Sequence, residues 1–285
     1  MDGSPASTLL EYMGPCHLWA LKTYRLCAHR CVYCNTWAQG ISRPVVPLPE
    51  VIDVLRRELA RVPPDSRIVI GPPTDGYPPA EAHYGVTRAV VTELLRQGRA
   101  IGIVTKGTAV MRDAALLAAA GDRACVHVSL SALDDAMLRR LESGAPSAHA
   151  RLTLIRRLRA ARVAVQVGAA PWIPGVSDAR ALLAAVPSDV IVQFGPLDLA
   201  QLPVDDPLGI GRRFTQAKID ADYLKERRRV GADARARWLY PIARGRDIMI
   251  YMPPLGGRGR RPHAGLKGKR RGAHWRRGSS SPVLR

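Results

Sequence analysis

The stretch LCAHRCVYCNTW, residues 26–37, holds three of the five cysteines in a chain of 285 residues. Cys27, Cys31 and Cys34 follow a C-x3-C-x2-C spacing, and Tyr33 stands directly before the last of them. Three thiolates from one short loop can hold three corners of a 4Fe–4S cluster and leave the fourth iron without a protein ligand. A metal that keeps an open coordination position is one at which chemistry takes place. The motif therefore predicts a reactive iron–sulfur cluster.

A structural zinc site is the alternative for these cysteines, with Cys16, His17 or His29 as the fourth ligand. Zinc ribbons and fingers usually carry two separated ligand pairs, whereas this cluster of cysteines directly follows one expected strand. An odd number of crowded cysteines is also untypical of a secreted disulfide framework. We therefore favour the iron–sulfur cluster over zinc.

Short apolar runs alternate with amphipathic stretches from residue 18 to residue 194, which predicts βα units around a parallel sheet. The expected strands are residues 18–26, 67–71, 100–105, 124–131, 163–173 and 189–194. The expected helices are residues 49–62, 80–98, 111–121, 134–142, 146–162 and 178–186. Six successive strand–helix units indicate an α/β fold.

The pattern weakens beyond Gly195, so we predict a core over residues 1–200, a C-terminal subdomain over 201–252 and a basic tail over 253–285. The subdomain is expected to hold a charged helix over 214–230 and a strand over 247–252. The tail carries ten basic and no acidic side chains, about half of the formal net charge of +19. Its Gly/Arg/Ser-rich composition predicts disorder in isolation. Its charge is compatible with a nucleic-acid partner, although GC-rich coding or a nonspecific solvated extension would also explain it.

The sequence also gives an expectation for the cellular location of the protein. No run reaches the roughly 18 consecutive apolar residues of a membrane span, and the N-terminal stretch lacks the layout of a secretion signal. We expect a cytoplasmic protein with no membrane partner, and the oligomeric state stays open.

The motif CAHRCVYC (27–34) is similar to the signature of radical S-adenosylmethionine (radical SAM) enzymes, with Tyr33 in the aromatic position. Four further motifs resemble, in order and spacing, those at strand ends in the spore photoproduct lyase-like branch, also described as DNA repair photolyase-like. They are GPPTDGYPPAE (71–81), IVTKGT (103–108), VHVSLSALD (126–134) and AAPWIPGVSD (169–178). The resemblance covers roughly residues 16–195. It implies a partial (β/α)6 TIM-like barrel with functional groups at the carboxyl ends of the strands.

The resemblance implies a cofactor pair: a 4Fe–4S cluster on the three cysteines and S-adenosylmethionine chelated by the open iron. Reduction of that pair would give a 5′-deoxyadenosyl radical, so an electron donor such as flavodoxin or ferredoxin is implied as a partner. Lys106 matches the lysine that pairs with the methionyl carboxylate, a charge-assisted contact. Ser129 matches a hydroxyl that holds the cofactor, and we take Thr74 as a further cofactor-binding residue.

The same resemblance implies that Tyr33 lies against the cluster and the adenine, and that Asp75, Tyr77 and Glu81 face cofactor or substrate. We take Tyr33, Asp75 and Glu81 as the catalytic candidates. Structural alternatives stay open for the two carboxylates. Asp75 would also fit as a residue that forms a turn, and Glu81 as an acid in the first turn of a helix, where it complements the helix dipole. Alternatives to cofactor binding also stay open for Lys106 and Ser129. Lys106 would fit as a solvated residue at the end of a strand, and Ser129 as an ordinary buried hydroxyl. Four other side chains are expected to be structural: His83, His127, His149 and Cys125.

Two positions depart from the branch. In spore photoproduct lyase itself, a cysteine just before the Thr/Ser-Asp segment and a tyrosine after the third cluster cysteine return the hydrogen atom. Pro72 and Asn35 occupy these places, and neither transfers a hydrogen atom as a thiol or phenol does. Unless Cys16 substitutes, thymine-dimer repair by that route is not expected.

The leading hypothesis is a radical SAM enzyme that abstracts a hydrogen atom from its substrate, with nucleic acid as the first candidate. The first alternative is the same chemistry on a small metabolite or peptide. An alternative of another class is a nonenzymatic nucleic-acid-binding protein with structural zinc.

Overall fold

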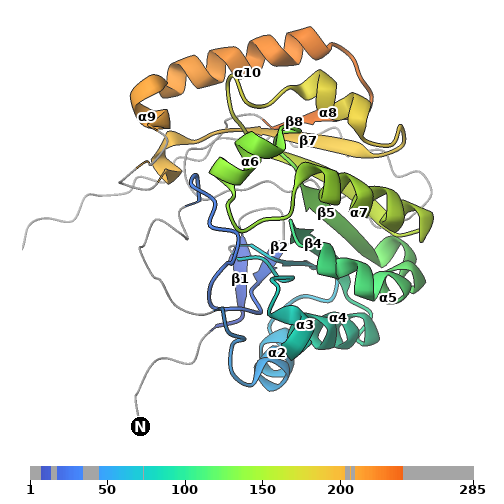
Figure 1. The fold of residues 1–285 in the computed structure, drawn as a ribbon. Helices are drawn as coiled ribbons and strands as arrows, with labels where there is room; N and C mark the ends of the chain where they lie inside the picture. Colours follow the sequence, from blue (N-terminus) through green and yellow to red (C-terminus); the bar gives the residue numbers. More distant parts are fainter. Residues whose placement is uncertain are drawn as a thin grey trace, which may run out of the picture. The chain divides into compact units, whose positions relative to one another are not determined.

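The computed structural model describes residues 8–13, 18–34, 45–72, 74–202, 206 and 209–239. All of them belong to one compact unit of the chain. Its eight strands form a single sheet in the order of the sequence, β1 to β8. Strand β1 is antiparallel to β2, and every later neighbour pair is parallel. The helices lie along one side of this curved sheet (Figure 1).

The six expected strands are all present, and two short strands were missed. The strands are β1 (Leu10–Met13), β2 (Leu18–Leu21), β3 (Arg67–Ile70), β4 (Ala100–Thr105), β5 (Ala124–Ser129), β6 (Ala164–Trp172), β7 (Ile191–Pro196) and β8 (Ala236–Trp238). Strand β2 is shorter than predicted, because Thr23 already turns away to hydrogen-bond the side chain of Thr87. The strand expected at residues 247–252 lies outside the described residues.

Each predicted helical region contains a helix, but two predictions differ in detail and the short helix α9 was not predicted. They are α2 (Val51–Leu59), α3 (Glu81–Tyr84), α4 (Val86–Arg96), α5 (Ala114–Ala119), α6 (Asp135–Leu141), α7 (Ala148–Ala160), α8 (Ala179–Ala185), α9 (Ile210–Arg213) and α10 (Gln216–Val230). The single helix predicted over residues 80–98 is wrong, since Gly85 adopts φ of 63° and separates α3 from α4. The helix predicted from residue 111 begins instead with a 3-10 segment, Thr108–Asp113. Across the described ranges, every helix is too short or too polar to cross a lipid bilayer.

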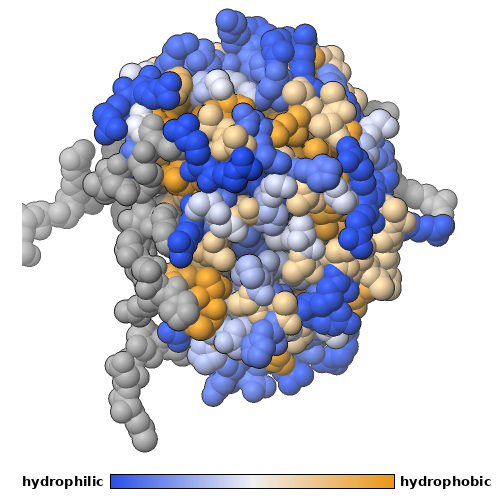
Figure 2. Space-filling view, in the orientation of Figure 1, coloured by the Kyte–Doolittle hydropathy of each residue, from blue (hydrophilic) through white to orange (hydrophobic). Residues whose placement is uncertain are grey.

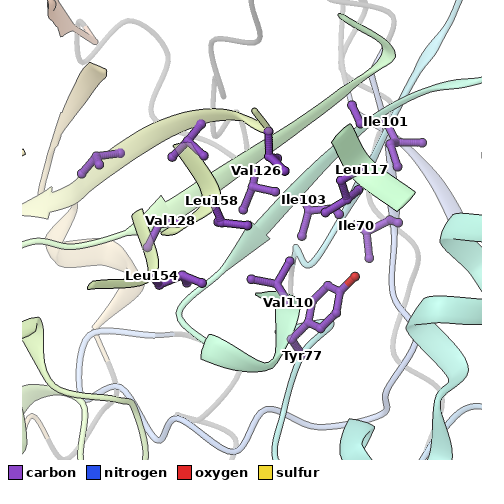
Figure 3. Packing of buried hydrophobic residues seen from close by; sticks show 14 of the residues in the cluster. Ile70, Tyr77, Ile101, Ile103, Val110, Leu117, Val126, Val128, Leu154 and Leu158 are labelled. Atoms are coloured by element: carbon purple, nitrogen blue, oxygen red, sulfur yellow. The ribbon is translucent and has the colours of Figure 1, made fainter. Parts of the chain in front are cut away.

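The main core lies between the sheet and its helices. Because side chains alternate along a strand, one apolar set points to the helical side, including Ile70, Ile103 and Val126. These side chains pack in one cluster with Val110 and Leu158 (Figure 3). Burial of this large apolar set is the main source of stability for the sheet.

The C-terminal part of the described chain is attached to the same sheet. The single hydrogen of the Tyr223 hydroxyl on α10 faces the backbone oxygens of Phe194 and Leu239, which lie 2.7 Å and 2.9 Å from the hydroxyl oxygen. The ring of Trp238 on β8 stacks on Phe194 with centroids 4.5 Å apart. Strand β8 therefore extends the sheet, and α10 packs against β7. The predicted boundaries of a separate subdomain stay a prediction.

The opposite face of the sheet is more polar. His127 on β5 pairs in register with Gln166 on β6, and both side chains are buried. A Cβ atom on Gly168 would lie 2.1 Å from His127 Nε2, so the imidazole occupies the space that glycine leaves open. Burial lowers the pKa of His127 from 6.5 to about 4.

This buried imidazole predicts a pH-dependent stability. The folded protein holds His127 neutral, so its contribution is complete above pH 6.5 and declines as the pH falls toward 4. Relative to a His127→Gln variant, wild type is expected to lose about 2 kcal/mol of unfolding free energy between roughly pH 8 and pH 5. Urea unfolding of both proteins at the two pH values measures this difference. Parallel pH profiles would contradict it.

Candidate active site

The predicted site residues lie at the carboxyl ends of four neighbouring parallel strands. The cysteine loop, residues 27–34, follows β2, and Thr74 and Asp75 follow β3. Lys106 follows β4 directly, and Ser129 is the last residue of β5. Because the carboxyl ends of parallel strands meet at one edge, the fold brings these residues together.

The cysteine loop is largely buried. Cys31 is 6% exposed, Cys27 and Cys34 are half-buried, and the backbone N–H of Cys34 donates to the Cys31 oxygen at 3.0 Å. Burial raises the pKa of Cys27 to about 11 and the pKa of Cys31 to about 12, and Lys106 opposes both shifts. Ligation of these sulfurs by a metal would therefore release protons.

The three sulfurs of the cysteine loop are the donors that this part of the site offers to a metal. The charges of Cys27 and Cys34 both act on Cys31, so the three sulfurs share one neighbourhood. Within the described part of the chain, no three His, Cys, Asp or Glu side chains converge as ligands of one metal ion. Thiolates that bind a 4Fe–4S cluster attach to different irons and need no common point. The donor set of three soft thiolates fits such a cluster.

Lys106 belongs to a buried charged network that the sequence did not predict. Its Nζ atom lies 3.9 Å from Glu142 Oε1 and 5.9 Å from the centre of the Tyr33 ring. Glu142 accepts a 2.5 Å hydrogen bond from Arg151, whose side chain is fully buried, and another from the Tyr33 hydroxyl. Burial alone would raise the pKa of Glu142, but the charges of Lys106 and Arg151 lower it. The tyrosine of the cysteine motif is thus fixed by its hydroxyl.

Asp75 and Thr74 lie inside the site, and their partners are protein groups. The Asp75 carboxylate is 5% exposed and accepts hydrogen bonds from His29, Tyr77 N, Thr105 and Lys106 N. Burial alone would raise the pKa of Asp75, but the hydrogen bond from His29 leads the contributions that lower it to about 2. Thr74 donates to the Tyr24 oxygen at 3.3 Å.

Glu81 lies in a second buried network. Its carboxylate accepts from Tyr24 (2.5 Å), Thr87 N (2.9 Å), Arg88 N (3.1 Å) and Arg112 (2.7 Å). The two backbone donors belong to the first turn of α4, so Glu81 caps that helix. A direct role of Glu81 or Asp75 toward a substrate stays a prediction.

Two residues of these networks, Glu142 and Arg151, were not singled out from the sequence, and His29 was considered only as a fourth ligand of the zinc alternative. One signal was available, because Arg151 falls on the apolar stripe of α7 with Ala148, Leu154, Ile155 and Leu158. An arginine on a buried stripe requires a buried partner. No periodic pattern pointed to Glu142 as that partner.

A family model described as the radical SAM superfamily matches residues 21–184. The match spans more than half of the chain, and the chain therefore belongs to this enzyme superfamily. The resemblance drawn from the cysteine motif is thereby confirmed. Membership implies S-adenosylmethionine and an iron–sulfur cluster as cofactors.

Curated relatives exist in mycobacteria. The uncharacterized protein Rv2578c of Mycobacterium tuberculosis is 34% identical over 175 residues, and so is Mb2609c of Mycobacterium bovis. The alignment covers 56% of this chain and 51% of each relative, so the chain spans about half the length of the curated relatives that it matches.

Solved structures share the fold. Spore photoproduct lyase complexed with dinucleoside spore photoproduct aligns with a TM-score of 0.51 at 16% identity, covering 78% of this chain and 68% of that chain. Streptococcus suis SuiB bound to precursor peptide SuiA aligns with a TM-score of 0.51 at 12% identity, covering 81% and 50%. These similarities confirm the α/β fold, with which the expected partial TIM-like barrel is consistent.

Proposed function

We propose that the chain is a radical SAM enzyme in which Cys27, Cys31 and Cys34 hold a 4Fe–4S cluster and Lys106 binds the carboxylate of S-adenosylmethionine. The observation that carries the proposal is the approach of the partly buried Lys106 to the cysteine loop, with Nζ 5.9 Å from the centre of the Tyr33 ring. When bound and reduced, the cluster supplies one electron that cleaves S-adenosylmethionine to methionine and a 5′-deoxyadenosyl radical, which removes a hydrogen atom from the substrate. Flavodoxin or ferredoxin is the proposed class of electron donor.

The role of Lys106 is supported by the charges around it. Two cations, the partly buried Lys106 and the fully buried Arg151, face the single carboxylate of Glu142. Arg151 makes the short contact, whereas the ammonium group of Lys106 lies at the long distance of 3.9 Å. An ammonium group has three donors, so Lys106 keeps capacity for a second carboxylate. A ligand with an α-carboxylate supplies that charge.

The contact predicts a binding defect. Lys106→Met keeps the length of the side chain but removes a charge-assisted hydrogen bond, so the Kd for S-adenosylmethionine is expected to rise about tenfold to a hundredfold. Anaerobic calorimetric titration of the reconstituted protein measures this change. Lys225→Met on the exposed side of α10 is the matched control and should bind as wild type. An unchanged Kd for Lys106→Met would remove Lys106 from the cofactor site.

Nucleic acid is the first proposed substrate class. The support is the basic tail together with cations on α9 and α10, where Arg212, Arg213, Lys225 and Arg228 are exposed. Strongly hydrophilic residues cover α10 on the face drawn in Figure 2. A spore photoproduct lyase variant of similar fold holds AdoMet and a dinucleoside photoproduct. Phosphate contacts by such cations are expected to be salt-dependent.

A peptide or small metabolite is the second candidate. It is favoured by Pro72, which stands where a hydrogen-returning cysteine would serve base repair, and by the fold shared with a structure bound to a precursor peptide. Removing residues 253–285 separates the two candidates. If nucleic acid is the substrate, salt-sensitive binding to DNA or RNA falls, while cleavage of S-adenosylmethionine continues.

The metal itself tests the proposal against the zinc alternative. Protein purified without oxygen is expected to contain iron and sulfide and to absorb near 400 nm, a general property of iron–sulfur clusters. A colourless protein with stoichiometric zinc would overturn the proposal and favour a nonenzymatic binding protein.

A further inference from the structure

His29 lies between the first two cysteines of the motif, and each of its ring nitrogens lies within 3.3 Å of an oxygen atom. Its side chain is buried, with Nε2 2.7 Å from Asp75 Oδ2 and Nδ1 3.3 Å from the Gly144 oxygen. An ionised carboxylate only accepts, so Nε2 carries the hydrogen of the shorter contact. The backbone oxygen of His29 also accepts from the Gly144 N–H at 3.0 Å. A residue that served only as a spacer between two ligands would need none of these contacts.

Asp75 connects His29 to the end of β4. The same oxygen, Oδ2, accepts from His29 Nε2 and from the backbone N–H of Lys106, both at 2.7 Å. The other oxygen accepts from Tyr77 N at 2.8 Å and from the Thr105 hydroxyl at 2.6 Å. Four donors fix the carboxylate in place, so the cysteine loop and the residue proposed to bind the cofactor share one buried anchor.

Gly144 completes the arrangement from the other side of the loop. A Cβ atom at this position would lie 1.9 Å from the Ala28 oxygen, so only glycine allows the two backbones to approach so closely. The preceding residues continue the contact, because Val32 N donates to the Leu141 oxygen at 2.9 Å and Cys31 forms a β-bridge with Glu142. The cysteine loop therefore packs against the segment that follows α6.

We propose that His29 is a positioning residue that, through Asp75 and Gly144, holds the cysteine loop closed before any metal binds. We call these three residues the clasp. The clasp keeps Cys27 and Cys31 on either side of His29 in a fixed position relative to Lys106. The identity of the ligand that the loop receives rests on the proposed function, whereas the closure of the loop in the metal-free chain does not.

The rate of thiol alkylation in the metal-free, full-length protein tests the clasp. Mass spectrometry assigns the rate to each cysteine, and buried Cys125 on β5 is the internal control. In His29→Ala, loss of the buried hydrogen bond to Asp75 is expected to speed the labelling of Cys31 about tenfold to a hundredfold, with Cys125 unchanged. Equal rates of Cys31 in wild type and His29→Ala would overturn the proposal, and so would an equal rise at Cys125.

Two conservative variants keep the test independent of the folding of His29→Ala. His29→Gln carries an amide N–H that can reach Asp75, so its Cys31 is expected to label close to the wild-type rate. His29→Asn retains a donor only toward Gly144 and should label faster than His29→Gln. The reverse order would exclude Asp75 as the partner that matters.

The labelling result and the proposed function can fail separately. If the clasp variants label as expected while the reconstituted wild type makes no 5′-deoxyadenosine, the clasp stands and the radical function falls. If wild type makes 5′-deoxyadenosine but His29→Ala labels as wild type, the function stands and the clasp is wrong. Iron content after reconstitution is a second readout, expected to be lower in His29→Ala than in His29→Gln.

Discussion

Cys31→Ala is expected to lose the iron–sulfur cluster, with iron content and the absorbance near 400 nm falling at least about tenfold after anaerobic reconstitution. Cys31 is the middle cysteine of the loop and the most buried of the three. Its removal leaves two thiolates, which cannot hold three corners of a cluster. The measurement is iron and sulfide per chain on matched preparations.

Cys125→Ala is the control for this prediction. Cys125 is also a buried free cysteine, but it lies within β5 and outside the loop. Its variant is expected to bind iron as wild type does. Equal iron in the Cys31 and Cys125 variants would show that the motif is not the cluster site.

Glu142→Gln is expected to destabilise the fold by about 3–5 kcal/mol, which lowers the Tm by about 10 °C. The substitution preserves the shape of the side chain but removes the carboxylate that, among the described residues, pairs with the fully buried Arg151. Lys106 loses the same partner. An uncompensated buried guanidinium is costly, because the interior solvates its charge poorly. Thermal unfolding of the metal-free protein measures the effect.

Glu11→Gln serves as the control, since Glu11 is exposed on the edge strand β1. Its variant should unfold within about 0.5 kcal/mol of wild type. If Glu142→Gln were as stable as this control, groups other than Glu142 would stabilise the buried charge of Arg151.

The sequence predicted the sheet well because each central strand carries its own signal. Strands such as β4 and β5 are short apolar runs between helices with regular apolar faces, so local periodicity is sufficient. Strands β1 and β8 were missed because three or four residues at an edge give no such pattern. Gly85 was taken as part of a helix, since a single glycine is tolerated within a helical pattern.

The sequence predicted those residues of the candidate site that belong to motifs. Lys106, Ser129 and the three cysteines were placed at strand ends because a parallel sheet gathers those ends at one edge. The contacts between them could not be predicted. Glu142 meets Tyr33 across 109 positions of the chain, and His29 meets Asp75 across 46. Such long-range polar pairs depend on how helices and loops pack, on which periodicity carries no information.

The most direct test of the account is the formation of 5′-deoxyadenosine. Wild-type protein with reconstituted iron and sulfide is reduced without oxygen, S-adenosylmethionine is added, and the products are separated by chromatography. The proposed radical chemistry predicts 5′-deoxyadenosine from wild type and from Cys125→Ala, and none from Cys31→Ala. Iron-loaded, reduced wild type that binds S-adenosylmethionine and forms no 5′-deoxyadenosine would contradict it.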